Sequence, residues 1–189
     1  MINNSMSEDY IEQYKELIKQ NPDYAKGWEL EKHGSPQEIV NLIEKTNSKT
    51  LLDFGCGQGI QYTEWKVHDK YGFPLPTLYD PSIEKYSELP EETFDGIIST
   101  DVMEHIPEEE INSVLEYIFT HATKFVYIKL STKIACTILP NGKNAHATVK
   151  PISWWVDKIK NSPHFPSGVR VVVQDSRGGN NKMRIDKWK

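Results

Sequence analysis

Apolar residues in the first fifty positions recur at the three- and four-residue spacing of an amphipathic helix. Over residues 7–20 the apolar side is formed by Tyr10, Ile11, Tyr14, Leu17 and Ile18. A second stretch begins at Ser35, where Pro36 and Glu38 stand at the positions of a first helical proline and a capping-box glutamate. The pattern therefore predicts two helices in this region, the first of which ends before Pro22.

Beyond residue 50 the pattern changes to short apolar runs separated by turn residues. The predicted strands lie at residues 50–54, 77–79, 96–99, 125–128 and 169–173, with one more around Met183 and Ile185. Helical spacing returns after Pro107, where three glutamates favour a helix start, and again near Pro151. Strands that alternate with helices predict an α/β fold, with a mostly parallel central sheet and helices on both faces.

The composition fits a single soluble domain. The chain has 189 residues, of which 38% are hydrophobic and 26% charged, which is ordinary for a globular protein. No apolar run is long enough to cross a bilayer, and no secretory signal or disulfide framework is visible. We therefore expect one cytoplasmic domain over residues 1–189 with no membrane partner. Residues 1–34 are expected to form an N-terminal helical lid or extension.

The formal net charge of −5 argues against a protein that holds nucleic acid mainly through phosphate contacts. The charge is unevenly distributed, since acidic residues crowd 84–110 while residues 168–189 carry six Lys or Arg against two Asp. The basic stretch is either a binding surface for an anionic substrate or a solvated edge strand. The acidic balance favours a small-molecule partner over nucleic acid.

The strongest chemical signal is the string LLDFGCGQG at residues 51–59. An apolar strand runs directly into three glycines, and loops at the carboxyl ends of parallel strands are where open α/β sheets bind ligands. The string is not a dinucleotide fingerprint, because Ile60 stands where the third glycine is required. A phosphate-binding loop is excluded as well, because the chain contains no G-x-x-x-x-G-K-[ST] string.

The remaining pattern, D-x-G-x-G-x-G, resembles the first motif of class I S-adenosylmethionine-dependent methyltransferases, whose nucleoside ligand has no phosphates. The resemblance implies a Rossmann-like methyltransferase fold with S-adenosylmethionine as cofactor. It places Asp53, Gly55, Cys56 and Gly57 at the cofactor. Family members often carry cysteine in this loop, and we interpret Cys56 as a packing residue rather than a nucleophile.

Two further features match the same family in the same order. Asp80 ends the second predicted strand and is followed by Pro81, and the resemblance makes its carboxylate the acceptor of hydrogen bonds from the cofactor ribose. The string FDGIISTDVMEHIPEEE at residues 94–110 is similar to the fourth strand of the family and the D-x-x-E-H stretch after it. The residues that this resemblance places beside the methionine portion of the cofactor are Thr100, Asp101 and Val102.

The chain departs from the family around the third strand. Only thirteen residues, 81–93, precede the next predicted strand, which is too few for the usual helix and strand. The adenine-contacting residue cannot then be assigned, and residues near Leu89 are candidates to replace it. The segment after Gly59 is also a poor helix. Either the cofactor pocket is trimmed, or the chain is a degenerate relative that no longer transfers methyl groups.

On the acceptor side, His146 is the candidate general base, and the alternative is a hydrogen-bonded loop histidine. It lies in LPNGKNAHAT at residues 139–148, where the family places substrate loops. The whole chain also resembles small methyltransferase-domain proteins of bacteria and phages that carry a later L-P-N-G-x-N-A-H segment. His105 begins the next helix near the mouth of the site and is equally consistent with a structural role. No His or Cys cluster at ligand spacing predicts a metal.

Aromatic residues add further signals. Trp154 and Trp155 are adjacent on the helix predicted near Pro151, so they point in different directions. Trp155 fits the apolar side, while Trp154 either lines an acceptor pocket or packs under the loop that follows the fourth strand. Tyr24 and Trp28 are positioned to close over the cofactor as part of the lid.

The sequence thus predicts an S-adenosylmethionine-dependent methyltransferase that acts on a small-molecule or sugar-like acceptor. Two alternatives stay open. The chain could bind S-adenosylmethionine for a reaction of another type, or it could be a non-catalytic methyltransferase-like module that binds or scaffolds a partner.

Overall fold

The computed structural model describes residues 8–27, 35–176 and 182–185. Its centre is a six-stranded sheet in the order β2-β1-β3-β4-β5-β6. The strands are β1 (Leu51–Phe54), β2 (Thr77–Tyr79), β3 (Phe94–Thr100), β4 (Ala122–Leu130), β5 (Arg170–Asp175) and β6 (Lys182–Arg184). Neighbouring strands from β2 to β5 pair in parallel, and β6 runs antiparallel to β5. The predicted mostly parallel sheet is confirmed.

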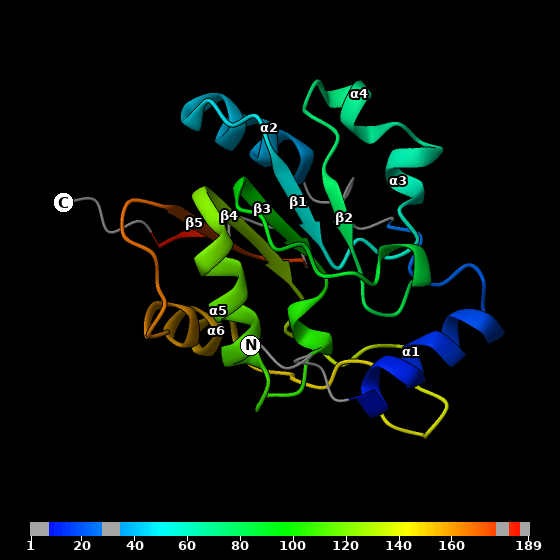
Figure 1. Cartoon of the computed structure of the whole chain (residues 1–189). Helices are drawn as coiled ribbons and strands as arrows, with labels where there is room; N and C mark the ends of the chain where they lie inside the picture. Colours follow the sequence, from blue (N-terminus) through cyan, green and yellow to red (C-terminus); the bar gives the residue numbers. More distant parts are fainter. Residues whose placement is uncertain (1–7, 28–34, 177–181, 186–189) are drawn as a thin grey trace.

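Helices cover both faces of this sheet (Figure 1). They are α1 (Glu8–Gln20), α2 (Ser35–Thr46), α3 (Ile60–Thr63), α4 (Val67–Tyr71), α5 (Ile111–His121) and α6 (Ile152–Lys160), with 3-10 turns η2 (Glu84–Tyr86) and η3 (Met103–His105). Side chains of α5 and α6 share a buried core with one face, and those of α2 and α4 share another core with the opposite face. α1 lies across the end at which β1 and β2 finish (Figure 1).

The central parts of β1, β3, β4 and β5 are mostly apolar because both faces of the sheet are covered. In β4, Val126 and Ile128 belong to the core beneath α5 and α6. The alternate residues Phe125 and Tyr127 belong to the core beneath α2. This two-residue alternation is what produces the continuous apolar runs in the sequence.

One helix starts later than the sequence indicates. Residues 107–110 form a turn rather than a first helical turn, and the Glu110 N–H donates to the Pro107 carbonyl at 2.9 Å. α5 then begins at Ile111, with Glu110 as its N-cap. The prediction of a helix start at Pro107 is therefore wrong by one turn, because the i to i+3 bond closes a separate turn ahead of the helix.

The short segment after β2 leaves out a strand, as its length predicts. Within the described residues, 81–93 contain the single turn η2, so β2 is the edge of the sheet and β1 pairs directly with β3. The segment after Gly59 is likewise broken into the two short helices α3 and α4. The Rossmann-like architecture is present with its third-strand region shortened.

Candidate functional site

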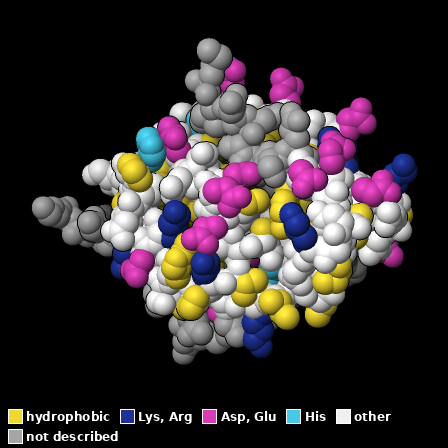
Figure 2. Space-filling model, turned by 90° about the horizontal axis from the view of Figure 1, so that it is seen from below, with side chains coloured by type: hydrophobic (Ala, Val, Ile, Leu, Met, Phe, Trp, Pro, Cys, Tyr) yellow, Lys and Arg dark blue, Asp and Glu magenta, His cyan; other side chains and the backbone are white. Residues whose placement is uncertain are grey.

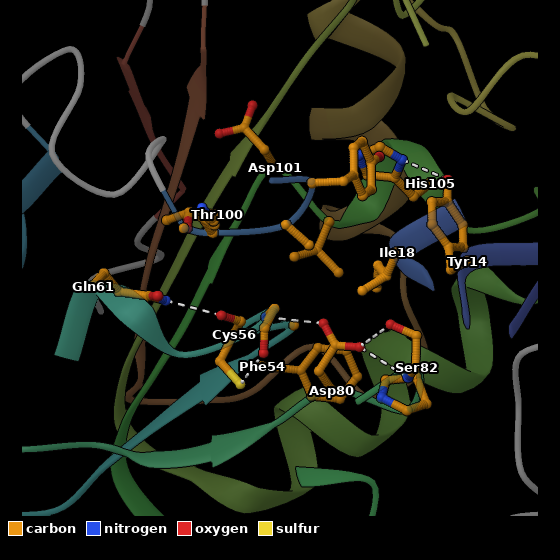
Figure 3. Close-up of a pocket in the computed structure, with 18 of the residues that line it drawn as sticks. Tyr14, Ile18, Phe54, Cys56, Gln61, Asp80, Ser82, Thr100, Asp101 and His105 are labelled. Carbon is orange, nitrogen blue, oxygen red and sulfur yellow. Dashed lines mark hydrogen bonds between the residues drawn. The ribbon is translucent and has the colours of Figure 1, made fainter. Parts of the chain in front are cut away.

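A cavity of about 340 Å³ opens at the carboxyl ends of three neighbouring strands. One side consists of the residues that directly follow or end β1, β2 and β3, namely 54–57, 80–82 and 100–102. The opposite side consists of α1 and the segment 23–27 after it. Figure 3 shows Asp80 and Cys56 on the strand side, with Tyr14, Ile18 and His105 on another side of the cavity.

Two positions of the glycine loop require glycine because neighbouring atoms leave no room for a Cβ. Gly55 has φ +84°, and a Cβ there would lie 2.3 Å from Cγ2 of Val102. Gly57 has φ +57°, and a Cβ there would lie 2.3 Å from the carbonyl oxygen of Ala25. Both positions combine a left-handed backbone with close approach, which suits glycine alone. The loop can therefore present bare backbone to the cavity.

The Asp80 carboxylate faces the cavity and is fixed by three hydrogen bonds. Its Oδ2 accepts from the Gly57 N–H at 2.9 Å. Its Oδ1 accepts from the backbone N–H and the hydroxyl of Ser82 at 2.9 and 2.6 Å. Burial raises the pKa of this carboxyl, and these hydrogen bonds oppose the rise. Oδ1 already accepts two hydrogen bonds and Oδ2 accepts one, so Oδ2 retains the capacity to accept from a ligand hydroxyl.

Asp53 lies under the glycine loop rather than in the cavity wall. Its Oδ2 accepts hydrogen bonds from the Tyr62 hydroxyl at 2.8 Å and from Nε2 of Gln61 at 3.3 Å. Gln61 lines the cavity and also donates to the Cys56 carbonyl at 2.9 Å. Burial raises the pKa of Asp53 to about 7. Asp53 thus supports the loop from beneath.

Cys56 and Pro81, which the resemblance assigns to the cofactor site, both line the cavity. The thiol of Cys56 is buried and donates a hydrogen bond to the Gly57 carbonyl. Burial raises the pKa of this thiol. A buried thiol that stays protonated is a packing group and not a nucleophile.

Asp101 is the middle residue of the third wall segment and has a strained backbone conformation. Its φ of +55° is rare for a residue other than glycine, and such strain concentrates at functional sites. Its backbone N–H donates to the Lys129 carbonyl at 2.7 Å, and its Oδ2 lies 3.3 Å from the Lys129 ammonium. Lys129 is fully buried. Thr100 and Val102 flank this residue in the cavity wall.

His105 is joined to α1 through Tyr14. The Nδ1 atom of His105 lies 2.7 Å from the Tyr14 hydroxyl and 3.0 Å from the Ala145 carbonyl oxygen. Tyr14 also donates to that carbonyl at 2.6 Å. Burial and the neighbouring His146 lower the pKa of His105 to about 4, so its ring is neutral at pH 7. With Nδ1 engaged, Nε2 is the atom left for chemistry.

His146 stands behind His105 and not in the cavity wall itself. The two rings meet edge to face with centroids 4.8 Å apart. Nδ1 of His146 is hydrogen-bonded to the Lys133 carbonyl. The sequence analysis expected this loop to bring His146 into the site. In the structure His146 contacts His105 but does not line the cavity.

Two residues at this end of the site escaped sequence reasoning. Glu104 is fully buried, and its Oε1 accepts from the Ser131 N–H at 2.6 Å. Burial and the charge of Asp101 raise its pKa. Its place inside the D-x-x-E-H string is a signal that could have identified it. Tyr14 gave no such signal, because an aromatic residue at helical spacing is predicted to be an ordinary core residue.

The expectation of no metal cluster rested on spacing along the sequence. In the fold, Glu104, His105 and His146 each offer one ligand atom, and the three atoms lie within 4.8 Å of one another. The sequence could not show this group, because the loop that carries His146 returns to η3 only in three dimensions.

The segment after α1 is bound to the glycine loop through Gln58. Gln58 donates through Nε2 to the carbonyls of Pro22 and Tyr24, at 2.8 and 2.5 Å. Its backbone N–H donates to the Ala25 carbonyl at 2.8 Å. Tyr24 lines the cavity, while Trp28, the other expected lid residue, lies outside the described residues.

The remaining candidates lie away from the cavity. Trp155 is fully buried in the core beneath α5 and α6, and Trp154 packs against the same core with the Lys150 ammonium 5.2 Å from its ring centroid. Leu89 also packs against this core. Neither Trp154 nor Leu89 is among the residues that line the cavity.

Most of the chain matches a known family model. The model of a family described as a methyltransferase domain matches residues 10–167. Neither the curated proteins nor the solved structures yielded a match. Among the described residues, no helix is both long and apolar enough to cross a membrane.

Proposed function

Because the chain belongs to the methyltransferase-domain family, whose model covers residues 10–167, we propose that it methylates a small, sugar-like acceptor. Methyl transfer from S-adenosylmethionine follows from the family as a whole. The acceptor class and the residues assigned below are the proposed part.

The observation that carries the proposal is the Asp80 carboxylate, held at the cavity by the Gly57 amide. The acceptor capacity left on Oδ2 suits a ribose hydroxyl, and a charge-assisted hydrogen bond of this kind contributes about 1.5–3 kcal/mol. Gly55 and Gly57 allow the backbone of the loop to approach a nucleoside closely. The cavity of about 340 Å³ is of the size of a small-molecule site.

We assign the other predicted residues to parts of the cofactor site according to where they lie relative to Asp80, the proposed ribose-binding residue. Cys56 and Pro81 form the adjoining wall, and Asp53 acts indirectly by holding Gln61. Thr100, Asp101 and Val102 are assigned to the methionine end, where Asp101 is fixed by Lys129. S-adenosylmethionine supplies an activated methyl group on its sulfonium, so the protein mainly has to align the acceptor.

We assign α1 and the segment 21–27 to a lid over the cavity. Ile11, Tyr14 and Ile18 of α1 line the cavity. The hydrogen bonds of Gln58 to Pro22 and Tyr24 attach the lid to the glycine loop. This arrangement would exclude water from the transferring methyl group. His105 and His146 are assigned to the acceptor side.

A small acceptor is favoured over nucleic acid by the charge distribution. Figure 2 shows the face that carries α1 and the 139–148 loop, and acidic and basic side chains are intermixed over its described part. A protein that follows a phosphate backbone needs a continuous basic surface. The net charge of −5 agrees with this choice.

Calorimetry of the wild-type protein with S-adenosylmethionine, S-adenosylhomocysteine, NAD and ATP tests the cofactor assignment. We expect binding of the first two alone, and an affinity loss on the order of 100-fold in Asp80→Ala. Asp157→Ala, on the exposed side of α6, is the matched control and should bind like the wild type. Equal affinity in Asp80→Ala would contradict the assignment. Binding without methylation of any hydroxylated acceptor pool would favour a non-catalytic module.

A further inference from the structure

Three side chains with metal-ligating atoms meet beside the cavity. Glu104 and His105 belong to η3, and His146 comes from the 139–148 loop. One ligand atom of each lies within 4.8 Å of the other two. Ligands about 2.0–2.2 Å from a zinc ion are roughly 3.4 Å apart in a tetrahedral site. The observed spacing of up to 4.8 Å is wider than this, so the three side chains would have to close in on a bound ion.

Both imidazoles are already oriented as metal ligands usually are. Nδ1 of His105 lies 3.0 Å from the Ala145 carbonyl oxygen, and Nδ1 of His146 is hydrogen-bonded to the Lys133 carbonyl. A carbonyl can only accept, so each ring carries its proton on Nδ1 in these bonds. Metal-bound histidines have this same arrangement, in which the outer nitrogen donates to a carbonyl and fixes the ring. Nε2 of both rings is then available as a ligand.

The Glu104 carboxylate has an unsatisfied acceptor atom beside the two imidazoles. The side chain is fully buried, and Oε1 accepts from the Ser131 N–H at 2.6 Å. Its other oxygen, Oε2, is buried and has no hydrogen-bond partner among the described residues. A buried polar atom without a partner is unfavourable in free energy. A metal ion at this point would provide the interaction that Oε2 lacks.

The two segments that carry the ligands are fixed to each other. Thr148 donates through its N–H to the Glu104 carbonyl at 2.9 Å and through its hydroxyl to the Ile106 carbonyl at 2.7 Å. These bonds hold the loop that carries His146 against η3. The ligands are therefore brought together by the fold before any ion binds.

We propose that Glu104, His105 and His146 bind one divalent transition-metal ion, such as Zn²⁺ or Mn²⁺. Two imidazoles with one carboxylate suit these ions better than Ca²⁺ or Mg²⁺, which prefer oxygen ligands alone. Three protein ligands leave coordination positions open. His105 also lines the cavity, so an oxygen donor of the acceptor, such as a sugar hydroxyl, fits the open side. The role of the ion in binding the acceptor rests on the proposed function, whereas the metal site itself does not.

Titration calorimetry of metal-free protein with ZnCl₂ and MnCl₂, without cofactor, tests the site. We expect one ion per chain, and an affinity at least tenfold weaker in His146→Ala and in Glu104→Gln. His164→Ala is the matched control, because His164 is an exposed histidine beside Glu116 and away from this cluster. It should retain wild-type affinity. Wild-type affinity in His146→Ala would overturn the proposal, as would loss of binding in His164→Ala.

Circular dichroism of each variant shows whether it folds. His146 is half-buried and outside the main core, so His146→Ala keeps the test valid even where Glu104→Gln misfolds. A separate titration with S-adenosylmethionine in the presence of a chelator separates the two proposals. Metal binding without cofactor affinity supports the site and removes its acceptor role. Cofactor affinity without metal binding overturns this inference and leaves the proposed function standing.

Discussion

The Tyr14 hydroxyl lies 2.7 Å from Nδ1 of His105, although the two residues are 91 positions apart in the chain. The same hydroxyl donates to the Ala145 carbonyl. One side chain of α1 thus contacts both the η3 turn and the loop that carries His146. The position of α1 and the orientation of His105 are therefore coupled.

Removal of this hydroxyl should weaken the attachment of α1. Tyr14→Phe leaves the ring in place and deletes the hydrogen bonds to His105 and Ala145. We expect the free energy of unfolding to fall by about 1–3 kcal/mol, because buried polar partners are left unsatisfied. Urea unfolding measures this change. Tyr71→Phe, on α4 and away from α1, should change it by much less, and equal losses in the two variants would contradict the coupling.

A methyl group at Gly55 should distort the cavity wall. Gly55→Ala forces a Cβ to within 2.3 Å of Val102 in a backbone with φ +84°. Gly142→Ala is a matched control, because Gly142 has φ +82° but no atom within 4 Å of its Cβ position. Both variants carry the backbone strain of about 1–2 kcal/mol, and only Gly55→Ala adds the steric clash. We expect thermal unfolding at a lower temperature in Gly55→Ala than in Gly142→Ala, together with lost cofactor binding.

Asp53 should make the protein less stable as the pH rises. Its pKa in the folded state is about 7, above the value of about 3.9 for an exposed aspartate. The folded state therefore binds more protons than the unfolded state between these two values. The free energy of unfolding then falls with pH, by up to about 1.4 kcal/mol per pH unit from this group. Urea unfolding from pH 4 to 8 measures the slope.

Asp53→Asn should flatten this slope, since the amide does not titrate and can still accept from Tyr62 and Gln61. The exposed Asp157→Asn is the control and should keep the wild-type dependence. A slope that is the same in Asp53→Asn and the wild type would assign the pH dependence to other groups.

Lys129 should be needed for the stability of the strained Asp101. The ammonium is fully buried and lies 3.3 Å from the Asp101 carboxylate. Lys129→Met removes the ammonium group, so the carboxylates of Asp101 and Glu104 lose its favourable charge. We expect a loss of about 3–5 kcal/mol in the free energy of unfolding. The double variant Lys129→Met with Asp101→Asn should recover part of this loss, and additive losses would argue against the pair.

The sequence predicted best what is decided locally. The glycines come directly after β1 and the aspartate directly after β2, so their positions could be predicted from the ends of the two strands. The parallel pairing of β1 and β2 then brings these residues together. The turn at Pro107 was missed because a single backbone hydrogen bond decides it. The absence of a strand in segment 81–93 could likewise be inferred from its length.

The acceptor side could not be predicted in the same way. Glu104, Tyr14 and His146 come from three separate segments, and their contacts depend on where α1 and the 139–148 loop return to the sheet. Periodicity assigned Tyr14 to a core, which is correct as far as burial is concerned. The hydrogen bond made by its hydroxyl is a property of the assembled fold alone.

The bond between Tyr14 and the Ala145 carbonyl also bears on the order in which the protein assembles during synthesis. Its partners are 131 positions apart, and at roughly 5–20 residues per second a ribosome needs on the order of ten seconds to cover this distance. Through that interval the aromatic side of α1 exists without the loop that it packs against. The attachment of α1 to this loop is therefore made only after β1, β2 and β3, whose ends line the cavity, have been synthesised.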